Sequence, residues 1–226
     1  MSRGVLVTGG GRGIGAVVAD AFRERGDEVV ALSSADADLA DPGAIARVVG
    51  SAVDRLGTID VLVNNAGLVE LGSLADSSYE EWQSLWRRAF AVNVFGAADM
   101  SYCVARHMID NGVRGRIVNV GSRGAFRGEP DMPAYGASKA ALHSMGQSLA
   151  VALAPHGIAV ASVAPGFVGT DRVASMVTDE VRRQSPFGRV AKPEEVAAAV
   201  VYLASAEAEW ASGAVLDLNG ASYLRT

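Results

Sequence analysis

The stretch that most constrains the fold joins a short apolar run to a helical pattern through a glycine-rich turn. Val5–Val7 favours a β-strand, Thr8–Gly15 forms the turn, and a helical pattern runs from about Ile14 to Arg25. Glycines at such a junction let the backbone approach a pyrophosphate, which the positive N-terminus of the helix attracts. The stretch therefore predicts a strand, a phosphate-binding turn and a helix in succession.

The glycine spacing departs from the usual dinucleotide fingerprint. Three residues rather than one separate Gly9 from Gly13, and Gly15 follows. A glycine-rich turn alone is weak evidence for a nucleotide site, but its place at an N-terminal strand–helix junction strengthens that interpretation.

The rest of the chain alternates between apolar runs and helical patterns. Further strands are expected at Glu28–Leu32, Ile59–Val63, Arg116–Gly121, Ile158–Ala164 and Ala214–Leu218, and helices at Pro42 to about Leu56, Tyr79 to about Asp110, Ala134 to about Pro155 and Pro193–Ser205. A short charged segment, Thr170–Gln184, is a candidate lid. This alternation predicts one α/β domain over residues 1–226, with a Rossmann-like, doubly wound and mainly parallel sheet.

One part of that pattern is too short. Only four residues lead from Ser33 to the Asp38–Asp41 stretch, and Pro42 then opens another helix. A parallel crossover needs about a dozen residues or more. We therefore expect the helix and strand after the second strand to be missing or vestigial, which would leave the adenine end of a cofactor site more open.

Tyr135 and Lys139 form the first candidate catalytic pair. They are four residues apart, so on a helix they share one face. A lysine ammonium near a phenol stabilises the phenolate and lowers its pKa, which makes tyrosine a usable general acid or base. The preceding loop can bring Ser122 to the Tyr135 hydroxyl. Tyrosine and lysine at this spacing are also common on helix surfaces, so the pair needs support from the rest of the chain.

Asn93 is a further candidate, with an alternative structural role. It lies between Val92 and Val94 in a helical pattern. A buried amide must find partners or cost free energy, so Asn93 is either a structural group or a site residue.

The end of the second strand bears on cofactor choice. An NAD enzyme commonly places an acidic residue there, against the ribose 2′-OH. Here the positions are Ser33 and Ser34, and Arg12 lies in the facing turn. This combination favours NADP(H), while NAD(H) stays possible if Arg12 is only a solvated side chain.

Composition excludes several other classes. Half of the 226 residues are hydrophobic, the net charge is -5 and the pI is about 5.2, which gives no support for binding nucleic acid or an anionic membrane. Cys103 is the only cysteine, and the three histidines make no metal-ligand pattern, so no metal is expected. No run is long and apolar enough to span a membrane and no leader opens the chain. We expect a soluble cytoplasmic protein.

Several motifs together resemble those of the short-chain dehydrogenase/reductase family, over essentially the whole chain. In order they are Thr8-Gly-x-x-x-Gly13-x-Gly15, Asn65-Ala66-Gly67, Asn93, Ser122, Tyr135-x-x-x-Lys139, Pro165-Gly166-x-x-x-Thr170 and Asn219-Gly220. Each motif could occur by chance, but the ordered set is strong. Within the family the chain looks most like the 3-oxoacyl-(acyl carrier protein) reductases, although the Pro186–Arg189 pattern is shared by sugar, polyol and steroid dehydrogenases.

The resemblance implies roles for the matching residues. Tyr135 would be the catalytic acid/base, Lys139 would depress its pKa and hold the nicotinamide ribose, Ser122 would bond the substrate oxygen, and Asn93 would anchor a water for proton relay. With Ser33, Ser34 and Arg12, the expected cofactor contacts are Gly9, Gly11, Gly13, Ile14, Asp38, Leu39, Asn65, Ala66, Gly67, Tyr135, Lys139, Pro165, Gly166, Val168 and Thr170. Arg123, Met132 and Phe167 are candidate substrate contacts. Arg123 is also a candidate for an anionic phosphopantetheine or carrier protein, or else a solvated side chain.

The leading hypothesis is an NADP(H)-dependent carbonyl reductase, or ketoreductase, with a 3-oxoacyl thioester or polyketide-like ketone as candidate substrate. An NAD-dependent alcohol dehydrogenase of sugars, polyols or steroids is the second reading. A non-catalytic NAD(P)-sensing protein is the third, and the intact set of Asn93, Ser122, Tyr135 and Lys139 argues against it. By resemblance, a homotetramer or homodimer is expected.

Overall fold

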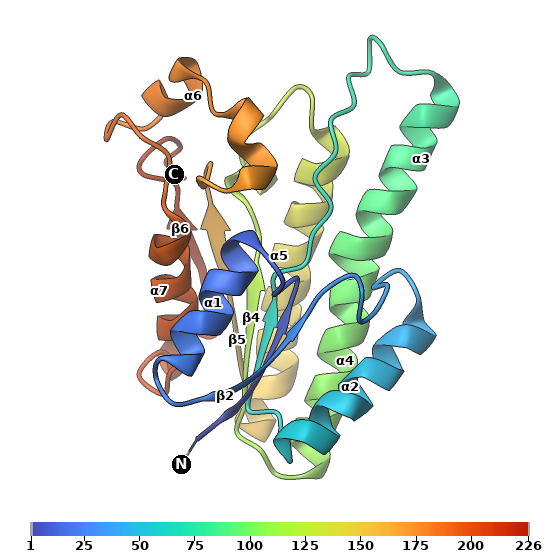
Figure 1. The fold of residues 1–226 in the computed structure, drawn as a ribbon, viewed down its shortest axis with the longest axis vertical. Helices are drawn as coiled ribbons and strands as arrows, with labels where there is room; N and C mark the ends of the chain where they lie inside the picture. Colours follow the sequence, from blue (N-terminus) through green and yellow to red (C-terminus); the bar gives the residue numbers. More distant parts are fainter. Residues whose placement is uncertain (1, 226) are drawn as a thin grey trace.

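A parallel sheet lies between two layers of helices in the computed structural model, which describes residues 2–225 (Figure 1). The strands are β1 (Gly4–Thr8), β2 (Glu28–Leu32), β3 (Val61–Asn64), β4 (Arg116–Val120), β5 (Ala159–Pro165) and β6 (Val215–Leu218). Their order across the sheet is β2-β1-β3-β4-β5-β6, and every neighbouring pair is parallel. The predicted α/β class is therefore confirmed, and the sheet is wholly rather than mainly parallel.

Helices cover both faces of this sheet. They are α1 (Gly13–Arg23), α2 (Pro42–Leu56), α3 (Tyr79–Phe90), α4 (Ala97–Asp110), α5 (Pro133–Leu153), α6 (Asp179–Arg183) and α7 (Pro193–Leu203). In Figure 1, α1 and α7 lie on one side of the sheet, whereas α2, α4 and α5 lie on the other. The candidate lid contains a 3₁₀ segment, Asp171–Met176, followed by α6.

Apolar side chains that point alternately to the two faces of the sheet form two hydrophobic cores, one on each face. In β1, Val5 and Val7 pack into the core beneath α1 and α7, whereas Leu6 packs into the core beneath α2, α4 and α5. Since successive side chains of a strand point to opposite faces, a strand covered on both sides reads as a continuous apolar run. This explains why the strands are Val- and Leu-rich.

The segment after β2 contains no further strand. Within the described residues, β2 is followed by a turn at Ser33–Ala37 and then by the start of α2, and β2 is the edge strand of the sheet. Asp41 caps α2 by accepting from the Gly43 N–H at 2.8 Å. The prediction of a missing strand and helix is therefore confirmed.

The long helical region at Tyr79–Asp110 has the predicted limits but is not one regular helix. A π-helical turn, Ala91–Gly96, separates α3 from α4, and Asn93 lies within it. Gly96 is required there, because a Cβ would come within 2.5 Å of the Leu39 carbonyl oxygen. Insertions of this kind frequently mark functional sites.

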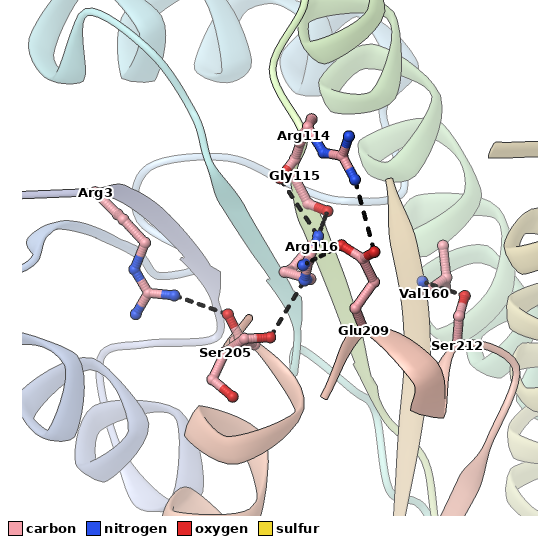
Figure 2. A network of polar contacts seen from close by, with 9 residues as sticks. Arg3, Arg114, Gly115, Arg116, Val160, Ser205, Glu209 and Ser212 are labelled. Carbon is pink, nitrogen blue, oxygen red and sulfur yellow. Dashed lines mark hydrogen bonds and ion pairs between the residues drawn. The ribbon is translucent and has the colours of Figure 1, made fainter. Parts of the chain in front are cut away.

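Polar contacts hold the amino ends of the strands together (Figure 2). The glycine-rich turn lies at the opposite, carboxyl end of the strands. Arg116, buried at the start of β4, donates to the Ser205 carbonyl at 3.3 Å and to Glu209 Oε2 at 2.9 Å. Arg3 Nη1 donates to the Ala204 carbonyl at 2.7 Å. These bonds tie β1 and β4 to the segment that follows α7.

Candidate active site

The glycine-rich turn between β1 and α1 is held by close backbone contacts. A Cβ on Gly15 would lie 2.2 Å from the Gly9 carbonyl oxygen and 2.3 Å from Asn65 Nδ2, so only glycine fits. The Asn65 amide donates to the carbonyls of Thr8 at 2.9 Å and Gly9 at 3.2 Å. Asn65, predicted to border a ribose, thus also fixes the shape of the turn.

The N-terminus of α1 opens from this turn. Arg12 is its N-cap residue and is exposed, and no acidic side chain occupies the first helical turn. Free N–H groups and the helix dipole favour an anion at such a position. A Cβ on Gly9 or Gly15 would collide with neighbouring atoms, and the positive φ of Gly9 and Gly13 favours glycine, so this turn fits the diphosphate of a dinucleotide.

Ser122 follows β4, and Tyr135 and Lys139 lie in the first turns of α5. Met132 and Pro133 start that helix, with the proline at a position where its missing N–H costs nothing. Ser122 forms a side-chain hydrogen bond with Tyr135, and its Oγ accepts from the Gly124 N–H at 3.0 Å. Lys139 is buried, with Nζ 5.9 Å from the Tyr135 ring centroid and 3.0 Å from the Val120 carbonyl to which it donates. The structure therefore brings these three residues together.

Burial is the largest cause of the pKa shifts of both Tyr135 and Lys139. Burial raises the pKa of Tyr135 above its usual value, although the Ser122 hydrogen bond and the charge of Arg172 lower it. Burial, helped by the charge of Arg172, lowers the pKa of Lys139 to about 8. Desolvation of the phenol outweighs the effects of Ser122 and Arg172, and the lowering of the tyrosine pKa by Lys139 stays a prediction.

One cavity of about 270 Å³ joins the glycine-rich turn to Ser122, Tyr135 and Lys139. The other predicted residues that line it are Gly9, Arg12, Gly13, Ile14, Asn65, Ala66, Gly67, Arg123, Met132, Pro165, Gly166, Phe167, Val168 and Thr170. A Cβ on Gly67 would lie 3.2 Å from Lys139 Nζ, so this glycine allows the backbone to pass close to the lysine.

Asn93 lies behind this lining rather than in it. Its Oδ1 accepts from the Leu68 N–H at 2.7 Å, and its Nδ2 donates to the Leu68 carbonyl at 3.0 Å and to Ser138 Oγ at 2.9 Å. In this state the amide acts as a structural group that fastens the segment after Gly67 to α5. Anchoring a water remains a prediction.

The residues expected at the adenine end lie outside the cavity. Ser33 sits over the turn, with its Cβ 3.2 Å from where a Cβ on Gly11 would lie. Both the Ser33 N–H and its hydroxyl donate at 2.7 Å to Asp36, whose pKa is lowered by these bonds. Asp36 was not expected from the sequence, because its approach to Ser33 depends on a tight turn. Ser34 and Asp38 are exposed, and Leu39 packs partly buried against Gly96.

Arg172 is a cavity residue that sequence reasoning missed. Its Nη1 donates to the Gly67 carbonyl at 2.7 Å, which joins the lid segment to the opposite wall of the cavity. Burial, together with the charge of neighbouring Arg12, lowers the pKa of Arg172. The only sequence signal was its place two residues after Thr170.

Arg123 is buried instead of solvated. It donates to Glu129 Oε1 at 2.6 Å, to Gln184 Oε1 at 3.0 Å and to Ser222 Oγ at 2.7 Å. Its charge is therefore compensated by Glu129, a second cavity residue that the sequence did not single out. The alternative of a solvated Arg123 is wrong.

His143 supports the catalytic loop from beneath. A Cβ on Gly121 would collide with its ring, and its Nε2 accepts from the Ser122 N–H at 3.5 Å. Burial and the charge of Lys139 lower the pKa of His143 to about 4, so it is neutral near neutral pH.

Residues 2–225 hold neither a metal-ligand cluster nor a membrane-spanning helix. Within that range, no group of three or more His, Cys, Asp or Glu side chains is arranged to hold a metal ion. No helix in the same range has the length and apolar character needed to cross a membrane.

Comparisons with known proteins place the chain among oxidoreductases. Residues 32–220 match a family model described as enoyl-(acyl carrier protein) reductase. The chain is 33% identical over 241 residues to a 3-oxoacyl-(acyl carrier protein) reductase of Vibrio cholerae, covering 97% of this chain and 96% of that protein. It is 34% identical over 251 residues to a sorbitol dehydrogenase of Cereibacter sphaeroides, with the same coverages of 97% and 96%.

Solved structures give the same placement. A 3-ketoacyl-(acyl carrier protein) reductase from Brucella melitensis, complexed with NADH, superposes with a TM-score of 0.90 at 29% identity, covering 98% of both chains. The ligand-free aldohexose dehydrogenase of Thermoplasma acidophilum gives a TM-score of 0.90 at 30% identity, covering 100% of this chain and 95% of that one.

A parallel sheet with a glycine-rich turn at one end of the cavity and Ser122, Tyr135 and Lys139 at the other is the arrangement of an NAD(P)-dependent oxidoreductase of carbonyl and alcohol groups. The chain belongs to the short-chain dehydrogenase/reductase family.

Proposed function

We propose that this protein is a carbonyl reductase that prefers NADP(H) and reduces a 3-oxoacyl thioester or a comparable compact ketone. The observation that carries the proposal is the single cavity in which Ser122, Tyr135 and Lys139 meet the glycine-rich turn. The printed names of relatives from Vibrio cholerae and Brucella melitensis support the thioester.

The cofactor would supply a hydride to the carbonyl carbon, and the chain would supply position and protons. Ser122 holds the substrate oxygen next to Tyr135, whose hydroxyl donates the proton to that oxygen. The raised pKa of Tyr135 keeps it protonated near neutral pH, which suits a general acid in reduction. Lys139 adds a donor beside Gly67, where a ribose would lie.

The preference for NADP(H) rests on the end of β2. Ser33 and Ser34 stand where an acid would repel a 2′-phosphate, and Arg12 is exposed at the facing helix N-terminus. A relative named as bound to NADP has a TM-score of 0.89 at 26% identity. Asp36 opposes this preference by bringing a carboxylate to Ser33.

A sugar or polyol dehydrogenase working with NAD is the second candidate. Two relatives, the sorbitol and aldohexose dehydrogenases, favour it. The same residues serve both directions of hydride transfer, so the site geometry alone is neutral between them.

Assembly and location complete the proposal. We propose one domain over residues 1–226, which acts in the cytoplasm as a homotetramer or homodimer on a small molecule, either free or tethered to a carrier protein. Phe95, Tyr102 and Val151 are large apolar side chains left exposed on the π-helical turn, α4 and α5, which supports self-association.

The test is a titration of the purified protein with NADPH and NADH, followed by addition of a short 3-oxoacyl thioester. Tighter binding of NADPH, and its oxidation when the thioester is added, is the expected result. Tight NADH binding without thioester turnover, together with oxidation of a polyol by NAD⁺, would overturn the proposal in favour of the second candidate.

A further inference from the structure

A second cavity of about 280 Å³ lies beside the catalytic one. Its wall includes the apolar side chains of Val181, Val190, Val196 and Leu218. Its polar and charged lining residues include Gln184, Asn219, Arg189, Glu195 and Asp217. Two residues, Arg123 and Phe167, line both cavities and therefore form the wall between them.

This wall is anchored from several directions. The Arg123 guanidinium lies 5.6 Å from the centroid of the Phe167 ring. Arg123 is only 3% exposed and is bonded to Glu129, to Gln184 at the end of α6, and to Ser222 near the end of the chain. Because a buried charge that lost its partner would be strongly destabilising, these bonds hold Arg123 in place, and Phe167 rests on a rigid support.

The wall stands directly beside the reacting centre. Arg123 follows Ser122, the residue that would hold the carbonyl oxygen, and Phe167 follows the Pro165-Gly166 pair at the end of β5. Both residues also line the cavity that holds Ser122 and Tyr135, so a substituent of a carbonyl carbon bound there can reach this wall. The catalytic cavity, at about 270 Å³, is at the lower end for small-molecule sites and must also receive the nicotinamide end of the cofactor.

We propose that Arg123 and Phe167 form a partition that limits this enzyme to carbonyl substrates with one short substituent, by closing off the apolar cavity behind them. The substrate class is then short-tailed 3-oxoacyl thioesters or similarly compact ketones. This inference rests on the proposed carbonyl chemistry but assigns a specificity role that the chemistry alone does not require.

The test removes the partition while leaving Arg123 in place. Phe167→Ala joins the two cavities, and Phe167→Leu is a milder variant that preserves an apolar side chain. A homologous series of straight-chain 2-alkanones is bound to each variant saturated with NADP⁺, and affinities are measured by calorimetry. Since NADP⁺ cannot reduce a ketone, this readout does not depend on turnover.

In the unmodified protein the affinity is expected to stop rising after the first few members of the series. In Phe167→Ala it should keep rising by roughly threefold to fourfold per added methylene, as expected for apolar burial. Phe167→Leu should fall between the two. Adding Ala191→Leu, which places a bulkier side chain in the wall of the second cavity, should restore the early plateau in the Phe167→Ala background and change nothing when introduced alone.

Two results would overturn the partition. One is a wild-type affinity that rises with every added methylene, since the second cavity would then already be open. The other is an unchanged plateau in both folded Phe167 variants. Failure of the wild type to reduce any 3-oxoacyl thioester would instead contradict the proposed substrate, and the ketone series would still decide on the partition.

Discussion

At the scale of single residues, the site depends on burial as much as on charge. Tyr135 keeps a raised pKa because desolvation outweighs both the Ser122 hydrogen bond and the charge of Arg172. Arg172 is the charge that opposes this effect, and it also lowers the pKa of Lys139. Arg172, in the candidate lid segment, thus acts to lower the pKa values of two residues in α5. The sequence motifs did not indicate this position.

Replacing Arg172 with Met should shift the pH profile of alcohol oxidation to higher pH. Oxidation requires the Tyr135 phenolate, and the lost positive charge raises the pKa of both Tyr135 and Lys139. The measurement is initial rate against pH with a saturating alcohol. Arg172→Lys, which retains the charge, should stay close to the wild-type profile, as should Arg183→Met on the exposed face of α6. A loss of rate with no shift in the profile would mean that Arg172 acts only through its bond to Gly67.

At the scale of elements, the turn after β2 stands in place of a strand and a helix. It therefore changes which residues are available at the adenine end of the cofactor site. Its length could be predicted, because counting residues is enough to exclude a crossover. The hydrogen bonds between Ser33 and Asp36 could not be predicted, since they depend on how the shortened turn folds. The π-helical turn around Asn93 escaped prediction for a related reason: it is held by Leu68 and Ser138, which are distant in sequence.

Replacing Asp36 with Asn should tighten NADPH binding by roughly twofold to fivefold, with a smaller effect on NADH. The carboxylate lies at Ser33, next to the turn that carries Arg12, and its negative charge repels a 2′-phosphate. An asparagine retains an oxygen that can accept from Ser33. The measurement is nicotinamide fluorescence titration at low salt, with Asp54→Asn on the exposed face of α2 as control. Equal changes for the two cofactors would place Asp36 away from the 2′ position.

At the scale of the whole molecule, the carboxyl and amino ends of the strands have different roles. The carboxyl ends of the strands carry the cavity, as is general for open parallel sheets, whereas the amino ends are fastened by Arg116 and Glu209 (Figure 2). The order of elements and the meeting of Ser122, Tyr135 and Lys139 were predictable from spacing. The cavity wall at Arg123 was not predictable, because Glu129, Gln184 and Ser222 contact Arg123 only in the folded chain.

Replacing Glu209 with Ala should lower the free energy of unfolding by about 1–2 kcal/mol, because buried Arg116 loses one partner but keeps its bonds to backbone carbonyls. Arg114→Ala is the control, since this exposed arginine only approaches Glu209 at 3.6 Å and should change stability by less than about 0.5 kcal/mol. Urea unfolding measures both. Equal stabilities for the two variants would show that the Glu209–Arg116 contact adds nothing.

The central claim is that Tyr135 is the acid and base of a hydride-transfer enzyme, and Tyr135→Phe tests it most directly. Turnover and NADPH affinity should be measured on the same preparation of the variant. We expect the rate to fall by about 10²-fold to 10⁴-fold, the usual contribution of general acid–base catalysis, while the dissociation constant for NADPH changes little. Turnover that persists at the wild-type rate in Tyr135→Phe would contradict the account.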